Sequence, residues 1–169
     1  MTYPGVETER LTLRAFGEED IEPLYAIMSD PVAMQYTYIA PSKEQCVQRL
    51  QAYAALEEAL GYAPWTVISR EEEQVIGWGG LNIDPFDPGW GVEVSYCLDP
   101  AYWGKGYATE LVAAAIEVGV GTFQLPTIMA FTHVENVGSA RVLEKCGFRL
   151  LGYEPRLDRN HYELQPTLP

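Results

Sequence analysis

The sequence has no long uncharged stretch. Nowhere in its 169 residues do about 18 apolar residues follow one another, the length that a membrane-spanning helix needs. The first residues, "MTYPGVETERLTLR", carry charges where a secretory leader has an apolar run. No segment repeats at a fixed period, which argues against a repeat array. We therefore expect one domain over residues 1–169, no membrane segment and a cytoplasmic location.

Cysteine and histidine are scarce. The three cysteines, Cys46, Cys97 and Cys146, lie far apart and outside any C-x-x-C pair, so the sequence indicates neither a disulfide framework nor a zinc site. No spacing of histidine, cysteine and carboxylate residues is typical of another metal site. We expect reduced thiols and no bound metal.

Positive charge is also scarce. The chain has 24 Asp and Glu residues against 11 Lys and Arg residues, a net charge of −13. A protein that binds nucleic acid needs an electropositive surface for the phosphates, so we expect no such partner. An acidic surface would attract a cationic partner, although solubility alone also accounts for an acidic composition.

Hydrophobic periodicity predicts the elements of an α/β protein. Alternation in "RLTLRAF" and β-branched or aromatic runs predict strands at residues 10–16, 63–70, 74–83, 90–98, 126–133, 148–154 and 159–165. Apolar residues at helical spacing predict helices at residues 18–29, 43–60, 108–119 and 136–147. This order combines hairpins with two strand-helix-strand crossovers. We expect a mixed sheet of about seven strands with helices on both faces.

The stretch "YWGKGYATEL", residues 102–111, carries two glycines between a predicted strand and a predicted helix. A helix start presents unpaired backbone N–H groups and the positive end of its dipole, which favour an anion. Gly104 and Gly106 would let a phosphate approach those groups, and Lys105 adds a cation. The alternative is that the glycines only relieve a tight turn.

Two common phosphate motifs do not fit this stretch. The nucleoside triphosphate pattern G-x-x-x-x-G-K-[ST] is absent, and the dinucleotide pattern G-x-G-x-x-G fails because its third glycine position is Thr109. The pyrophosphate of some other cofactor therefore remains as the ligand.

"DPAYWGKGYATELVAAAIE" resembles the pyrophosphate-binding motif of the GNAT N-acetyltransferase superfamily. Its pattern Q/R-x-x-G-x-G/A maps onto Trp103, Gly106 and Ala108, with tryptophan in place of Gln or Arg. The tryptophan form resembles the branch of ribosomal-protein N-terminal acetyltransferases. Three further stretches resemble that branch in the same order, from about residue 7 to 152: "ETERLTLRAFGEEDIEPLYAIMSDP", "VEVSYCLDP" and "NVGSARVLEKCGF".

The resemblance implies the GNAT fold, with a mostly antiparallel sheet, and acetyl-CoA as the co-substrate. It implies that the pantetheine arm pairs with Cys97 and Leu98, at the end of a strand that splays from its neighbour and so frees backbone N–H groups for the thioester. The pyrophosphate would bind beside Trp103 to backbone amides of Gly104, Lys105, Gly106, Tyr107, Ala108 and Thr109.

Glu93 is the first candidate for the base that an ammonium acceptor requires. It lies between Val92 and Val94 on the strand that leads to the thioester, where burial would raise its pKa. It could instead be a charged residue on a solvated face or the partner of a lysine. Glu154 and Asp158 are alternative bases.

The acid that protonates the departing thiolate is less obvious. Many GNAT enzymes place a tyrosine where this chain has Leu143, whereas the branch resembled uses N-x-x-S, which maps onto Asn136 and Ser139. Ser139 would lie near the sulfur, and Asn136 would bind the pantetheine or order a water, besides capping its helix. Tyr162 is a weaker candidate for the acid.

Other residues near the expected cleft have more ordinary interpretations. Cys97 lacks a neighbouring base and is expected to be a small core residue rather than a nucleophile. His133 could assist proton transfer, whereas His161 is expected to be structural or exposed. Cations on the crossover helices, Arg141 and Lys145 with Lys105, would offset the acidic chain near an anionic cofactor.

We therefore expect an acetyl-CoA-dependent N-acetyltransferase that acts on a primary amine by direct transfer in a ternary complex. A protein N-terminus, a lysine, an aminoglycoside and a small polyamine would all suit an acidic cleft. The alternative function is a non-catalytic acyl-CoA-binding or sensing module, which Leu143 in the tyrosine's place favours. Strand-edge pairing would give a homodimer, and the sequence does not decide the oligomeric state.

Overall fold

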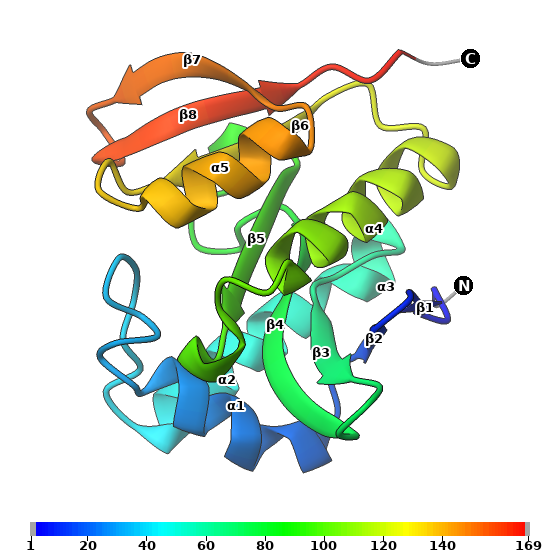
Figure 1. Ribbon diagram of the computed structural model, residues 1–169, viewed down its shortest axis with the longest axis vertical. Coiled ribbons are helices and arrows are strands. Elements are labelled where there is room, and N and C mark those ends of the chain that lie inside the picture. The colour runs from blue at the N-terminus through cyan, green and yellow to red at the C-terminus, as the bar shows by residue number, and fades with distance from the viewer. Residues whose placement is uncertain (1–2, 168–169) are drawn as a thin grey trace.

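An eight-stranded sheet organises the chain in the computed structural model, which describes residues 3–167 (Figure 1). The strand order is β1-β2-β3-β4-β5-β6-β8-β7. The strands are β1 (Val6–Glu7), β2 (Leu11–Ala15), β3 (Trp65–Ser69), β4 (Gln74–Asn82), β5 (Glu93–Leu98), β6 (Ile128–Thr132), β7 (Arg149–Glu154) and β8 (Arg159–Leu164). Every pairing is antiparallel except that of β5 with β6. The predicted mixed, mostly antiparallel sheet is confirmed.

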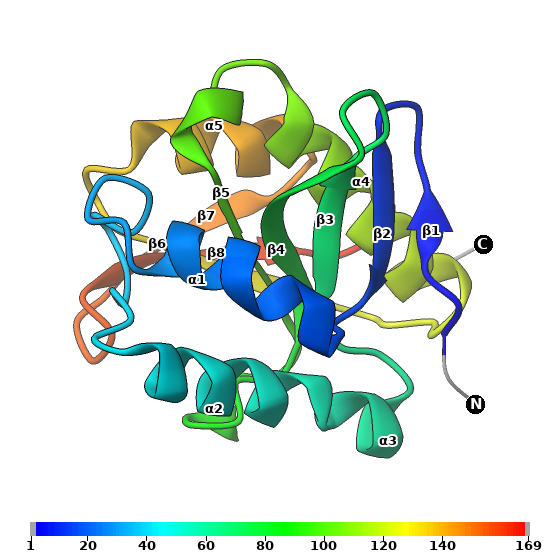
Figure 2. The same ribbon diagram turned by 90° about the horizontal axis from the view of Figure 1, so that it is seen from below.

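Helices cover both faces of this sheet, as predicted. The helices α1 (Ile21–Met28), α2 (Lys43–Ala54) and α3 (Leu56–Leu60) lie on one side, while α4 (Tyr107–Gly121) and α5 (Val137–Lys145) lie on the other (Figure 2). The predicted helix at 43–60 is two helices that meet at Ala55. The predicted start and end of this helical segment are confirmed. Ser42 caps its start by accepting a hydrogen bond from Gln45 N at 3.1 Å, and Gly61 ends α3 with a φ of 82°.

One strand was not predicted. Val6–Glu7 forms β1 and pairs with β2, which brings the count to eight rather than about seven. A two-residue strand is too short to show an alternating pattern in the sequence.

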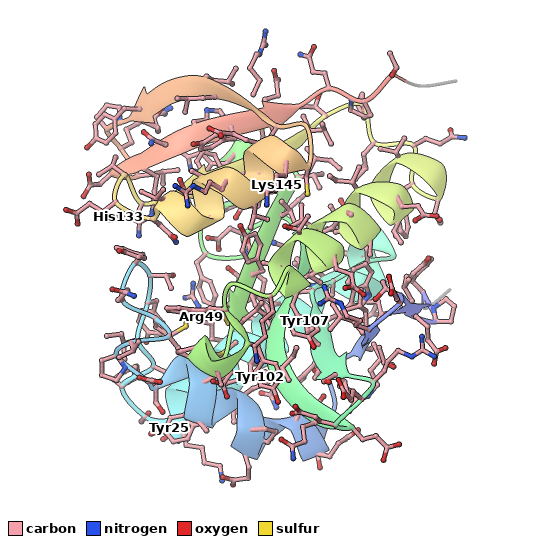
Figure 3. The ribbon with its side chains drawn as sticks, in the orientation of Figure 1. Tyr25, Arg49, Tyr102, Tyr107, His133 and Lys145 are labelled. Carbon is pink, nitrogen blue, oxygen red and sulfur yellow. The ribbon has the colours of Figure 1, made fainter. Side chains whose placement is uncertain are left out.

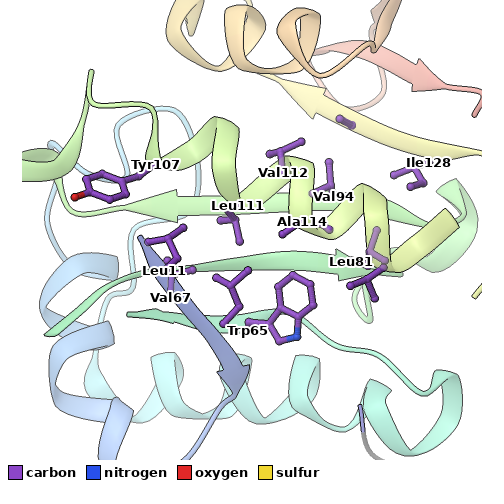
Figure 4. Close-up of a cluster of buried hydrophobic side chains, with 14 of the residues drawn as sticks. Leu11, Trp65, Val67, Leu81, Val94, Tyr107, Leu111, Val112, Ala114 and Ile128 are labelled. Atoms are coloured by element: carbon purple, nitrogen blue, oxygen red, sulfur yellow. The ribbon is translucent and has the colours of Figure 1, made fainter. Parts of the chain in front are cut away.

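The Ala-rich helix α4 packs directly on the sheet (Figure 4). Leu111, Val112 and Ala114 lie against Leu81 and Val94 of the sheet, and all five are 5% exposed or less. Burying each large side chain contributes about 1.5–3 kcal/mol. This packing fixes the start of α4, and with it the glycine turn, against β4 and β5.

The sheet opens between β5 and β6. Their parallel pairing is limited to Glu93 with Met129, whose N–H donates to the carbonyl of Val92 at 2.8 Å. Beyond that pair the strands part, and β7 and β8 lie turned across the direction of β5 (Figure 1). The predicted splay of these two strands is therefore present, and it leaves one edge of β5 unpaired.

No helix in residues 3–167 combines the length and the apolar character that crossing a membrane requires.

Candidate active site

A cleft of about 730 Å³ lies where β5 and β6 diverge. Its walls come from the glycine turn, β5, the start of α5, the α2 helix and the segments at 33–40 and 84–90. The cleft brings together most of the predicted site residues, namely Glu93, Cys97, Leu98, Trp103, Gly104, Gly106, Tyr107, Ala108, Thr109, Asn136 and Ser139. Lys105 is exposed and lies beside the ring of Tyr102, outside this lining.

The glycine turn has the conformation that its sequence predicts. Gly104 and Gly106 have φ values of 71° and 85°, in the left-handed region that favours glycine, and α4 begins at the next residue, Tyr107. Within residues 3–167, none of the backbone amides from Gly104 to Thr109 has a hydrogen-bond acceptor. Such amides at a helix start can bind an anion.

An ion pair fixes this turn to the N-terminal strands. The Glu110 carboxylate accepts from Thr8 Oγ1 at 2.6 Å, Arg10 N at 2.7 Å and Arg10 Nε at 2.8 Å. Arg10 also donates to the carbonyl of Lys105 at 2.8 Å and stacks on the Tyr107 ring. Burial opposes ionisation of Glu110, but the hydrogen bonds from Thr8 and Arg10 hold its pKa below the usual value.

Trp103 links the turn to the end of β5. Its indole Nε1–H donates to the carbonyl of Leu98 at 3.0 Å, although 43% of the residue is exposed. The tryptophan at the Gln/Arg position therefore holds the glycine turn against the carbonyl end of β5.

Two further residues of the crossover helices line the cleft. They are Lys145 on α5 and Tyr107 at the start of α4, both labelled in Figure 3.

The backbone of β5 alternates between the two neighbouring strands. Because the Val92 carbonyl bonds to β6, the backbone groups of Val94, Tyr96 and Leu98 also point to the unpaired edge. Cys97 pairs with Trp78 of β4, so its backbone groups point away from that edge. Burial raises the pKa of the Cys97 thiol to about 12, which keeps it protonated.

Glu93 has the environment of a base poised near neutral pH. Burial raises the pKa of its carboxyl to about 7, and the negative charges of Asp84 and Asp87 add to the rise. A hydrogen bond from Ser95 Oγ to Glu93 Oε1, at 3.1 Å, opposes it. Ser95 Oγ in turn accepts from Asn82 Nδ2 at 3.0 Å.

Ser139 pairs with a tyrosine that sequence reasoning missed. The hydroxyl oxygens of Tyr96 and Ser139 are 2.6 Å apart, and both residues line the cleft. Burial raises the pKa of Tyr96 to about 12. The alternation of β5 could have indicated this position of Tyr96. Tyr96 shares a sheet face with Val94 and Leu98, and these two residues pack against α4.

The candidate base Glu93 and the Tyr96–Ser139 hydroxyl pair lie on opposite faces of the sheet. Side chains at Glu93 and Tyr96 point to opposite sides because the period of a strand is two residues. Both nevertheless line one cleft, because the sheet is open beside β5. A substrate bond in that opening would be within reach of Glu93 from one face of the sheet and of Ser139 from the other.

Asn136 caps α5 as predicted, with its Oδ1 accepting from Ser139 N at 3.1 Å. This bond fixes the backbone of Ser139 at the first turn of the helix. Leu143 is 1% exposed and belongs to the core cluster.

The alternative bases lie elsewhere. Glu154 forms a hydrogen-bonded ion pair with Arg156, which lowers its pKa to about 2, and Asp158 bonds to Tyr153. Neither lines the cleft. Tyr162 is buried in the core. Of the histidines, His133 lines the cleft and stacks on Tyr36. His161 does not line the cleft and stacks on Phe131, which does.

The end of the cleft near Glu93 has aromatic walls. Trp90 donates to Asp87 Oδ2 at 2.8 Å and meets Phe131 edge to face. Arg49 also lines the cleft, and its guanidinium lies within 5 Å of the ring centroids of Tyr38 and Phe86. Within residues 3–167, no group of three or more His, Cys, Asp and Glu residues could hold a metal ion.

Comparisons with known proteins agree with this geometry. An N-acetyltransferase of Bacillus licheniformis, p20, is 33% identical over 86% of this chain and 82% of its own length. The ribosomal-protein-serine acetyltransferase of Escherichia coli is 27% identical over 90% of this chain and 86% of its own length. A crystal structure of an acetyltransferase from Agrobacterium tumefaciens matches with a TM-score of 0.84 and 26% identity, over 98% of this chain and 96% of that chain. Residues 10–149 match the family described as acetyltransferase (GNAT) domain, and the chain therefore belongs to the GNAT N-acetyltransferases.

Proposed function

We propose that this enzyme transfers the acetyl group of acetyl-CoA directly to a primary amine, with both substrates bound at once. The observation that carries the proposal is the single cleft that joins the unpaired amides of the glycine turn to Glu93, through the opening between β5 and β6. A donor bound along this path would have its phosphates at one end and its reactive bond near a base at the other.

The cofactor would be held mainly by backbone groups. Its pyrophosphate would accept hydrogen bonds from the amides of residues 104–109, with the cations of Lys105, Arg141 and Lys145 nearby. The pantetheine arm would follow the unpaired edge of β5, where Tyr96 and Leu98 point their backbone groups. Cys97 would contribute its side chain to the wall rather than a backbone bond.

Glu93 would accept a proton from the ammonium acceptor, directly or through one water. The amine nitrogen then attacks the thioester carbonyl carbon, and a free N–H of β5 stabilises the oxyanion. When the carbon–sulfur bond breaks, the sulfur would take a proton from Ser139, Ser139 would recover one from Tyr96, and solvent would reprotonate Tyr96. The nitrogen loses two protons, the first to Glu93, which passes it to solvent, and the second from the tetrahedral intermediate to water. The sum is one proton on the thiol and one released to solvent.

The bond between Tyr96 and Ser139 supports Ser139 as the donor. Either hydroxyl can donate in this bond, but a phenol is a stronger acid than an aliphatic alcohol. With Tyr96 as the donor, the one hydroxyl proton of Ser139 would be left for the sulfur. Because the pKa of Tyr96 is raised to about 12, it stays protonated over the physiological range.

The acceptor would be cationic. Asp84 and Asp87 line the cleft beside Glu93, and the chain as a whole carries a net charge of −13. A protein N-terminus, a lysine or a polyamine all fit this charge, and the E. coli relative is named for a ribosomal-protein substrate. A cytoplasmic location and a homodimer paired through an edge strand remain predictions.

An acceptor screen tests the proposal. The protein is incubated with acetyl-CoA and a panel of amines (a free N-terminal peptide, an N-blocked lysine peptide, spermidine and an aminoglycoside), and products are detected by mass. At least one amine should gain an acetyl group, and Glu93→Gln should lower turnover while acetyl-CoA affinity is unchanged. Tight acetyl-CoA binding without turnover on any amine would instead favour the sensing module.

A further inference from the structure

Asn82 is a fully buried polar residue beside the candidate base. It lies directly across from Glu93 in the β4–β5 pairing, and its relative exposure is 0%. Its amide nitrogen is 3.0 Å from Ser95 Oγ, 3.4 Å from the carbonyl of Gly80 and 3.5 Å from the carbonyl of Glu93. Burial of such a polar group costs free energy unless it is hydrogen-bonded.

These neighbours fix the orientation of the amide. Two carbonyl oxygens can only accept, so the group that faces them must be the nitrogen rather than Oδ1. The Oδ1 atom has no hydrogen-bond partner in the described part of the chain. Asn82 therefore leaves Oδ1 without a partner, while its N–H groups face Gly80 of β4 and Glu93 and Ser95 of β5.

The direction of the next bond follows from this orientation. Ser95 Oγ receives a hydrogen from Asn82, and its own single proton lies toward Glu93 Oε1 at 3.1 Å. We propose that Asn82 and Ser95 are positioning residues that hold the Glu93 carboxylate toward the cleft and favour its ionised form. The hydrogen-bond chain runs from Asn82 through Ser95 to Glu93, and its use in catalysis rests on the proposed function of Glu93 as the base.

The surroundings of Glu93 make such a donor necessary. Burial and the nearby charges of Asp84 and Asp87 favour the protonated carboxyl, which cannot accept a proton from an amine. From α2, the buried Tyr53 hydroxyl and the Arg49 cation face the same end of the cleft. Among the described residues, the Ser95 hydroxyl supplies the side-chain hydrogen bond that favours the charged form.

A purely structural role would give a different result. If Asn82 and Ser95 only braced β4 against β5, their replacement would change stability but leave the ionisation of Glu93 untouched. The pKa of Glu93 in the free protein separates these two cases, and it can be measured whether or not an acceptor is known.

The experiment is a ¹³C NMR titration of the glutamate carboxyl groups, with the Glu93 signal assigned by its absence in Glu93→Gln. Ser95→Ala removes the donor, Ser95→Thr keeps it, and Asn82→Ala removes the group that orients it. Ser69→Ala is the matched control, because Ser69 is a buried strand serine outside the cleft. Folding of each variant is checked by circular dichroism, and Ser95→Cys, with its weak S–H donor, replaces Ser95→Ala if that variant does not fold.

We expect Ser95→Ala to raise the Glu93 pKa from about 7 by about one pH unit. Asn82→Ala should raise it by less, and Ser95→Thr and Ser69→Ala should leave it at the wild-type value. An unchanged pKa in Ser95→Ala, or an equal rise in Ser95→Thr, would overturn the proposal. If the pKa shifts as expected but Glu93→Gln transfers acetyl groups at the wild-type rate, the positioning of Glu93 stands and its role as the base is wrong.

Discussion

The hydroxyl groups of Tyr96 on β5 and Ser139 on α5 lie 2.6 Å apart, and they join the unpaired strand edge to the start of the second crossover helix. This contact connects two residues 43 positions apart in the sequence. It places a second proton beside the serine that would serve the leaving thiolate.

Loss of either hydroxyl should slow the transfer step. A positioned general acid contributes about 10²–10⁴-fold, so Ser139→Ala should lower kcat by about 100-fold. Tyr96→Phe, which only frees the serine to point elsewhere, should cost about tenfold. The two changes should not multiply in the double variant, because Tyr96 acts through Ser139. Steady-state kinetics with the best amine of the panel checks this, and fully multiplicative losses would show that the two hydroxyls act separately.

The raised pKa of Glu93 predicts how activity depends on pH. The carboxylate is the form that accepts a proton, so kcat/KM should rise with pH through about 7 as Glu93 ionises. Glu93→Gln should lose about 100-fold in kcat and should no longer show this limb of the pH profile. A limb that persists unchanged in Glu93→Gln would assign it to another group.

The same pKa predicts a cost in stability. A carboxyl with a pKa of about 7 in the folded protein and an ordinary pKa of 4.5 favours the protonated folded state, so its stabilising contribution is complete below pH 4.5 and is lost as pH rises toward 7. The loss amounts to about 3 kcal/mol above that range. The free energy of unfolding of Glu93→Gln relative to wild type should therefore increase between pH 4.5 and pH 8. Urea titrations at the two pH values measure it, and a pH-independent difference would contradict the raised pKa.

The ion pair between Arg10 and Glu110 should matter for cofactor affinity. Arg10→Ala removes the hydrogen bond to the Lys105 carbonyl, which holds the glycine turn in place. The KM for acetyl-CoA should therefore rise about tenfold, or about 1.4 kcal/mol, with kcat little changed. Arg149→Ala is the matched control, because that side chain is 72% exposed and pairs with Glu163 far from the turn. A fall in kcat with an unchanged KM would mean that Arg10 does not act through the turn.

Gly106 should be the more sensitive of the two glycines in the turn. An added Cβ would meet the Arg10 guanidinium at 3.2 Å at this position, whereas the corresponding space at Gly104 is open. Both positions have left-handed φ values, which cost about 1–2 kcal/mol for other residues. Gly106→Ala should weaken acetyl-CoA binding more than Gly104→Ala in calorimetry. Gly121→Ala, in the last turn of α4 with open space around it, should leave binding unchanged, and equal effects of all three would refute a specific role for the turn.

The fold could be predicted because its signals are local. Alternation along β2 and β5, the capping side chains of Ser42 and Asn136, and the left-handed Gly61 each bound an element within a few residues. The break at Ala55 escaped prediction because alanine is a good helix former and no nearby residue marks the end of α2. A strand of two residues, β1, leaves no pattern at all.

The candidate site could be predicted only where the chemistry is local. The glycine turn and Glu93 are recognisable from the residues beside them. The contacts of Arg10 with Glu110 and of Tyr96 with Ser139 join residues 100 and 43 positions apart, and they arise because α4 and α5 pack on particular strands. Asn82 and Ser95 likewise meet only through the register of β4 with β5.

A crystal structure with acetyl-CoA bound tests the central claim most directly. The account predicts that the diphosphate oxygens accept hydrogen bonds from the amides of residues 104–109, and that the thioester lies in the β5–β6 opening with its sulfur within hydrogen-bonding distance of Ser139. A cofactor bound elsewhere, with those amides left without a phosphate, would contradict it.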